Sequence, residues 1–317
     1  MLAFLLLAPH AHAKPKVFTA VRIDLEGRAG LCPGEFQKLD VFGTEDGKES
    51  KVKAGSWKDF SITWELGPVS PKGALEMPLA PETTWGKTGL VEVKLLADPS
   101  VHAEAFLPAR YDCSMVIDRS GEVGPVGAGG EDGASSADAD GSDGQNGQGG
   151  RTGGPGHDLE VRVFLIKEPV RGVDVLQIKV TDLTTRESWN SAVAADGGKF
   201  IVRAAGGMGG PGGAGGDGGD GATERDGGDG ADGGEGGDGG VGGKITVLVD
   251  PNANGRTTAL VVENGGGPPG PGGSAGDGGQ AFDPGSPGAA GHVGHDGKAG
   301  PPGPPPDVRF EPVGQLF

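Results

Sequence analysis

The sequence predicts an all-β protein that carries a bundle of glycine-rich polyproline II rods. Glycine supplies 67 of the 317 residues, and in six runs it falls at every third position. Short alternating apolar segments of strand length lie between these runs, and no segment has a convincing helical pattern. The six runs, called arms 1 to 6, cover 121–133, 141–156, 206–221, 227–242, 267–279 and 285–303.

The three-residue period of the arms matches neither the α-helix nor the β-strand. It is the period of polyproline II, an extended left-handed helix without internal hydrogen bonds. Glycine along one edge of such a rod lets a second backbone come close enough to pair with the free N–H and C=O groups, which need partners. Short turn-like gaps at 134–140, 222–226 and 280–284 divide the arms into three hairpins. The pattern therefore favours a bundle folded from one chain.

Arms 3 and 4 differ from the others because most of their triplets contain two glycines, as in 233–240. Two glycine edges indicate close neighbours on more than one side, so the second hairpin is expected at the centre of two layers of three antiparallel rods. Each rod would be about 40–60 Å long at about 3.1 Å per residue. Disorder of a low-complexity region is one alternative. A collagen-like trimer is another, supported by the proline-rich stretches 267–271 and 300–306.

The amino-terminal part, 14–118, is expected to be a β-sandwich, because short alternating runs recur between turn residues. Trp57, Trp64 and Trp85 are expected to fill its core, with surface sugar binding as the alternative. Its strands are expected at 17–25, 39–42, 60–64, 89–96, 101–107 and 113–117.

The part that contains the arms, 119–311, is expected to form one sheet system from which all three hairpins project on the same side. Residues 312–317 are expected to form a tail. The expected strands of the base are 159–166, 175–180, 199–203, 244–249, 258–262 and 307–310.

The first 13 residues are typical of a secretory signal peptide, because an apolar stretch precedes Ala11-His12-Ala13, an A-x-A cleavage site. A bacterial protein that is secreted, periplasmic or on the outer cell surface is therefore expected. In that setting Cys32 and Cys113 are expected to form a disulfide across a loop of about 80 residues. Two buried free thiols are the alternative. No other stretch is long and apolar enough to span a membrane.

The net charge of −17 disfavours nucleic acid and anionic membranes as partners. No phosphate loop and no H-E-x-x-H motif occurs, so the protein is not expected to be an enzyme. Asp138 and Asp140 have part of the spacing of a calcium loop, but its glycine and distal glutamate are missing. No cofactor is expected, with calcium as the alternative. His292 and His295 would lie about 9 Å apart on one rod, too far for one metal ion.

The loops between paired arms are the expected binding elements, since loops on a rigid scaffold often carry recognition. A protein or a cell-surface glycan is the expected partner. Phe282 stands out as an aromatic residue in a short loop, and the alternative is that it plugs the open end of the bundle. The candidate binding residues are Phe282, Asp283, Thr223, Glu224, Arg225, Asp138 and Asp140.

A β-base with six such rods resembles the glycine-rich amino-terminal domain of the Obg family of GTPases. The stretches 206–213 and 236–240, the latter before the strand at 244–249, are similar to that family's motif, and the resemblance covers about 119–311. The phosphate loop of the family's GTPase half does not occur, so GTP binding and ribosome association do not carry over.

Similar bundles occur in glycine-rich phage tip adhesins and in springtail-type antifreeze proteins. They imply loops presented at a tip or a flat face along the side. The expected function is a non-enzymatic structural or adhesion protein, with a collagen-like matrix or stalk protein and an ice-binding protein as alternatives.

Overall fold

The computed structural model describes residues 17–52 and 54–317, so the predicted signal peptide at 1–13 lies outside the described residues. The described residues form strands β1 to β16 and four short 3-10 helices, with no α-helix, which confirms the all-β prediction. None of them belongs to a helix that is long and apolar enough to cross a bilayer. The chain divides into unit 1, Met1–Arg110, and unit 2, Tyr111–Phe317.

The described residues of unit 1 form three small antiparallel sheets, and its sandwich architecture stays a prediction. Trp64 is buried in its core, whereas Trp57 and Trp85 are only half-buried. Its short helices are η1 (Ala54–Asp59) and η2 (Pro81–Thr83). The sheets are β1 (Ala20–Asp24), β3 (Asp40–Glu45) and β4 (Lys48–Lys51); β2 (Phe36–Lys38) and β6 (Ala74–Glu76); and β5 (Phe60–Trp64), β7 (Leu90–Leu95) and β8 (His102–Phe106).

Unit 2 has a base of two sheets around one apolar core, to which both sheets contribute, for example through Ile178 and Phe200. The five-stranded sheet is mixed and has the order β12-β11-β10-β14-β16. Its members are β10 (Leu159–Lys167), β11 (Asp174–Asp182), β12 (Ser188–Ala194), β14 (Ile245–Val249) and β16 (Asp307–Phe310). The other sheet is parallel, with β15 (Leu260–Glu263), β13 (Lys199–Arg203) and β9 (Ser114–Asp118) in that order. The helices η3 (Pro251–Ala253) and η4 (Thr257–Ala259) lie between β14 and β15.

Two expectations about the base are wrong. It consists of two sheets, not one sheet system. The segment expected as the last strand of the amino-terminal domain, β9, instead pairs in parallel with β13 in unit 2. The alternation of apolar and polar residues identifies a strand but not the strand with which it pairs. Here the partner of β9 comes after the first hairpin in the sequence. The predicted disulfide between Cys32 and Cys113 is confirmed.

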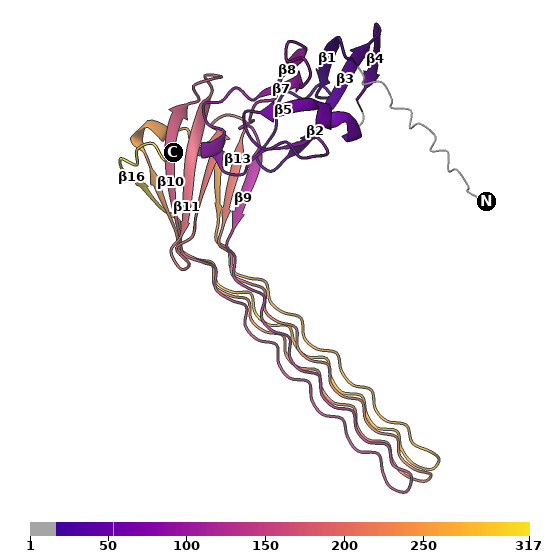
Figure 1. The fold of residues 1–317 in the computed structure, drawn as a ribbon. Helices are drawn as coiled ribbons and strands as arrows, with labels where there is room; N and C mark the ends of the chain where they lie inside the picture. The colour runs from indigo at the N-terminus through magenta and orange to yellow at the C-terminus, as the bar shows by residue number, and fades with distance from the viewer. Residues whose placement is uncertain (1–16, 53) are drawn as a thin grey trace, which may run out of the picture. The chain divides into compact units, whose positions relative to one another are not determined.

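The six arms are direct continuations of the parallel strands of the base (Figure 1). β9, β13 and β15 lead into arms 1, 3 and 5, and arms 2, 4 and 6 lead back into β10, β14 and β16. The backbone bonding crosses from strand to arm without a break, since Arg119 N–H donates to Arg203 C=O and Gly121 N–H to Ala205 C=O, each at 2.8 Å. The arms therefore keep the order of the two sheets.

Each arm bonds to any one neighbouring arm through every third residue. Arms 1, 3 and 5 form one layer, as where Gly124 N–H donates to Met208 C=O (2.8 Å). Arms 2, 4 and 6 form the other, as where Gly147 N–H donates to Asp232 C=O (2.9 Å). Antiparallel bonds between successive arms join the two layers. Arms 3 and 4 each bond to four other arms, which is where their second glycine edge is used.

The glycine positions of the arms are those where two backbones touch. A Cβ added at Gly150 would lie 2.0 Å from the carbonyl oxygen of Gly210 in arm 3. By contrast, a Cβ on the preceding Gly149 would meet nothing nearer than 3.5 Å. The period of three therefore follows from the lack of room for a side chain between neighbouring arms.

Candidate functional site

The loops at the far ends of the three hairpins form one tip. Ala222 N–H donates to Ala139 C=O (3.0 Å), which joins the second loop to the first. Thr223 and Phe282 form an isolated parallel bridge, and Glu224 N–H donates to Phe282 C=O (3.3 Å), which joins the second loop to the third. Candidate residues from three separate stretches of sequence therefore lie at one end of unit 2.

The side chain of Phe282 is 55% exposed, which argues against a buried plug at the end of the bundle. Thr223, Glu224, Arg225 and Asp283 are exposed beside it in the second and third loops. These side chains offer an aromatic ring, two acids and a base within one small surface. Whether this surface binds a partner stays a prediction.

The two acidic candidates of the first loop have partners within the bundle. Asp140 Oδ1 accepts a hydrogen bond from Asp226 N–H (3.1 Å), and Asp138 Oδ1 accepts a longer one from the Ser136 hydroxyl (3.4 Å). Among the residues that the structure describes, no group of three or more His, Cys, Asp or Glu side chains could hold a metal ion. Asp140 thus has a structural role in joining the first hairpin to the second.

Acidic side chains along the arms bond to backbone N–H groups of the next arm in the same layer. Asp143 Oδ1 accepts from Asp229 N–H (2.8 Å), and Asp229 Oδ1 accepts in turn from Ala289 N–H (2.7 Å). From the sequence alone, Asp229 and the other aspartates of the Gly-Gly-Asp triplets would be interpreted as a solvated acidic edge, and that interpretation misses this role. The sequence signal that could have found this role is the spacing between the aspartate and the residue that donates to it. This spacing is 86 residues between arms 2 and 4 and 60 residues between arms 4 and 6. Asp132, Asp217 and Asp277 form a similar row in the other layer.

A histidine also contributes to one of these rows. His292 N–H and His292 Nδ1 both lie within hydrogen-bond distance of Asp232 Oδ1, at 2.7 and 3.0 Å. The backbone N–H, followed by the imidazole, lowers the pKa of the Asp232 carboxyl below its ordinary value. His292 is thereby bound to an acidic neighbour on arm 4.

The root of the first hairpin is held by one buried carboxylate, Asp182, at the end of β11. Its Oδ2 accepts from Arg119 Nε (2.9 Å) and lies 2.6 Å from His157 Nδ1. Its Oδ1 accepts from the N–H groups of Thr184 (2.8 Å) and Thr185 (3.0 Å). Arg119 precedes arm 1 and His157 follows arm 2, so one side chain ties both ends of the hairpin to the base.

The surroundings of Asp182 stabilise its charged form. Burial alone would raise its pKa, but the Thr185 N–H, the His157 ring, the Thr184 N–H and the Arg119 guanidinium outweigh that effect. Together they hold the pKa of the carboxyl well below its usual range. Nothing in the pattern of the sequence pointed to this residue, since its partners lie 63 and 25 residues away.

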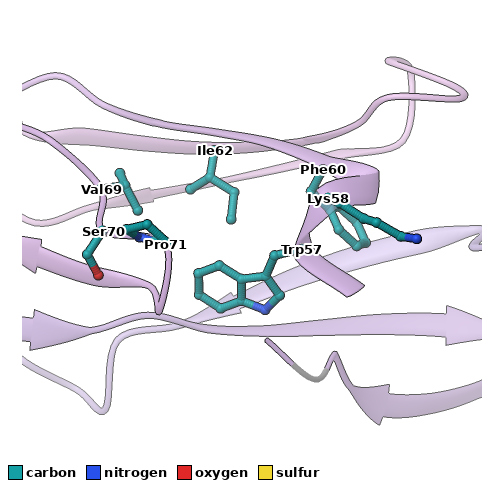
Figure 2. Close-up of a pocket in the computed structure, with 7 residues that line it drawn as sticks. All are labelled: Trp57, Lys58, Phe60, Ile62, Val69, Ser70 and Pro71. Atoms are coloured by element: carbon teal, nitrogen blue, oxygen red, sulfur yellow. The ribbon is translucent and has the colours of Figure 1, made fainter. Parts of the chain in front are cut away.

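Unit 1 carries a shallow pocket of about 370 Å³, lined by two aromatic rings, three aliphatic side chains, one lysine and one serine (Figure 2). The Trp57 ring lies against the backbone of Gly73, where an added Cβ would come within 1.7 Å of it. Trp57 Nε1 donates to Val52 C=O (3.3 Å), so its polar atom faces the protein. The lining holds no carboxylate and no histidine, and Lys58 is its one charged side chain.

Comparison with known proteins yields no match to a family model, to a curated protein or to a solved structure.

Proposed function

We propose that this chain is an exported, non-enzymatic structural protein that presents binding loops at the end of a stiff bundle of polyproline II rods. The polyproline II conformation is supported by three features of the arms. They are neither helix nor strand, they repeat glycine with a period of three, and they bond through every third residue. In its architecture the bundle resembles the glycine-rich domain of the Obg family.

An extracytoplasmic location is part of this proposal. The Cys32–Cys113 disulfide supports it, because disulfides persist in secreted and periplasmic proteins and are rare in reducing compartments. The apolar first residues and their A-x-A site point the same way. We place the protein in the periplasm, in the medium or on the outer surface of a bacterium.

The stiffness of the bundle follows from the bonding between its arms. Each arm is bonded to at least two others along its whole length, and backbone N–H groups in the layers also bond to acidic side chains. Rods of this length would carry their loops about 40–60 Å from the base. Such a support suits contact with a large partner rather than turnover of a small substrate.

The observation that carries the proposal is the gathering of three loops into one exposed tip around Phe282. Aromatic residues and arginine are the side chains that most often dominate binding at protein interfaces. Phe282 and Arg225 supply both at the far end of the bundle, and Glu224 and Asp283 add polar contacts at the rim. A protein or a cell-surface glycan is the partner that this combination favours.

Binding of the fluorescently labelled full chain to immobilised bacterial cell envelopes and to a glycan array tests the proposal. The double variant Phe282→Ala/Arg225→Ala is expected to bind at least about tenfold more weakly, since two such side chains commonly contribute more than 1.4 kcal/mol. Val293→Ala is the control, because Val293 is also apolar and 67% exposed but lies on the side of arm 6. Absence of binding by the unaltered protein, or equal binding by the tip variant, would overturn the proposal.

The two alternatives use the arms differently. In a collagen-like trimer the glycine edges face other chains, whereas here each glycine edge is filled by an arm of the same chain, which favours the single-chain bundle. Ice binding needs a flat, weakly charged face, and the exposed positions of arm 4 carry Asp229, Asp232 and Glu235 instead. The molecular mass in solution tests the collagen-like trimer, and a measurement of thermal hysteresis tests ice binding.

A further inference from the structure

β16 is the outermost strand of the five-stranded sheet, and no strand of the described chain covers its outer side (Figure 1). Val308 and Phe310 on this strand are 53% and 58% exposed. Their partners on β14, Val247 and Val249, are both buried. The apolar core of the base is therefore open along this edge, and an exposed apolar edge is a template for pairing with another strand.

The free backbone groups of this edge belong to Val308 and Phe310. Glu311 N–H donates to Val249 C=O, so residue 311 bonds toward β14. The bonding direction alternates along a strand, and Asp307 and Arg309 therefore also bond toward β14. Val308 and Phe310 direct their N–H and C=O groups away from the sheet.

The charges on β16 are complementary to a second copy of the same strand. Asp307 and Arg309 lie on the opposite face from Val308, and Arg309 Nη2 bonds to Asp307 Oδ2 within the strand. Their side chains are 36% and 58% exposed, so both can interact further. In an antiparallel pair centred on Val308, Asp307 of each copy lies opposite Arg309 of the other. Opposite charges in directly opposed positions stabilise a strand pair.

No other register within β16 has this property, although a pair centred on Phe310 would set Arg309 opposite Glu311, which follows the strand. A pair centred on Arg309 would place the two arginines opposite each other and Asp307 opposite Glu311, and like charges in opposed positions are destabilising. Centring on Val308 also places one Val308 against the other on the apolar face, with the Phe310 rings beside them. Among registers that pair residues of β16 alone, the sequence therefore favours the one centred on Val308.

We propose that two copies of this chain pair through antiparallel β16 strands, with Val308 on the two-fold axis. The interface is isologous, so it closes at a dimer and does not grow into a fibre. Val308 and Phe310 become covered, and the five-stranded sheet continues into that of the partner. Because β16 runs from the arms into the base, antiparallel pairing directs the two bundles in opposite directions. The dimer then carries a tip at each end, which suits a tether between two surfaces. This pairing does not depend on what the tips bind.

Light scattering of the full chain over a range of micromolar concentrations tests the pairing. The unaltered protein is expected to approach twice the mass of one chain. Asp307→Arg and Arg309→Asp each place like charges opposite one another, so each variant alone is expected to stay a monomer. An equimolar mixture of the two variants restores opposite charges across the interface and is expected to recover the dimer. Loss of the bond within one strand cannot be rescued by mixing, so recovery identifies a contact between copies.

Arg162→Asp is the matched control. It removes a bond of the same kind, from Arg162 Nε to Glu160 Oε1 (2.7 Å), on β10 inside the same sheet, and should leave the dimer intact. Circular dichroism checks that each variant keeps its β content, and Val308→Lys gives a second disruption of the edge if a charge variant fails to fold. A monomeric or trimeric mass for the unaltered protein overturns the proposal. So does a mixture that stays monomeric, or a control that loses the dimer.

Discussion

Replacement of Gly150 by alanine tests the central claim that the arms touch along their glycine edges. The added Cβ would lie 2.0 Å from Gly210 O and 2.6 Å from both Gly210 C and Pro211 O. An ordinary contact needs at least 3.4 Å. Arms 2 and 3 must therefore separate by more than about 1 Å at this point, because the obstacle is backbone that cannot rotate away.

The separation has a calculable cost. Gly150 N–H donates to Glu235 C=O and Gly210 N–H donates to Arg151 C=O, each at 2.8 Å, so both bonds lie next to the clash. A typical hydrogen bond contributes about 1 kcal/mol net, and a group left unsatisfied costs about 1–3 kcal/mol. Loss of two or three bonds should therefore destabilise the bundle by about 2–4 kcal/mol.

Gly149→Ala is the matched control, one residue away on the same arm. Its Cβ would meet nothing nearer than 3.5 Å, and Gly149 does not have a positive φ. Alanine there restricts the unfolded chain without a clash, so the stability should stay unchanged or rise by up to about 1 kcal/mol. The two substitutions are chemically identical and differ only in the phase of the repeat.

Amide hydrogen exchange over 141–156 and 206–221 measures the difference. Gly150→Ala should speed exchange in these arms by about two orders of magnitude, since each 1.4 kcal/mol is a factor of ten. Gly149→Ala should leave it unchanged or slow it. Equal effects of the two substitutions would refute the reasoning. So would arms in the unaltered protein whose amides exchange as fast as those of a free peptide.

Two further predictions concern the root of the first hairpin and the disulfide. Asp182→Asn should lower the free energy of unfolding by about 2–4 kcal/mol at neutral pH, because it leaves the Arg119 guanidinium without its buried partner. The pKa of Asp182 is lowered in the folded state, so its contribution is complete above the unfolded value of about 3.9 and is lost as the pH falls below it. Urea unfolding at several pH values should thus show the variant and the unaltered protein converging in acid. Replacing Cys32 and Cys113 together by alanine should cost about 4 kcal/mol in the chain-entropy model, measured by the same titration, and an unchanged midpoint would contradict it.

The arms could be located from the sequence because their requirement is local. Where two backbones touch there is little or no room for a Cβ, and the repeat therefore records most of these contacts as glycines. The strand partners could not be located in this way. β9 alternates as a strand should, but its pairing with β13 depends on where the first hairpin returns to the base. β12 was missed because its sequence, Ser188–Ala194, has no regular alternation of apolar and polar residues.

Part of the candidate site could also be predicted, because its sequence signal is local. The tip loops are visible as breaks in the repeat, so Phe282 and Arg225 could be chosen without a structure. The bonds from Asp143 to arm 4 and from Asp229 to arm 6 depend on the register between arms, which a single sequence shows only as a constant offset. The role of Asp182 can be recognised only from the three-dimensional structure, because its side chain bonds to Arg119 and His157 at opposite ends of the first hairpin.

The continuous bonding from the strands of the base into the arms limits how the length of the bundle can change during evolution. A triplet inserted into a single arm keeps its later glycines in phase with the adjoining arms, but it makes that arm one triplet longer than they are, so the extra residues must leave the bundle at the tip or at the root. Only a concerted change, one triplet in each of the six arms at the same level, keeps every contact and moves the tip by about 9 Å. The reach of the bundle therefore changes in whole triplets, and a longer bundle needs the same number of added triplets in all six arms.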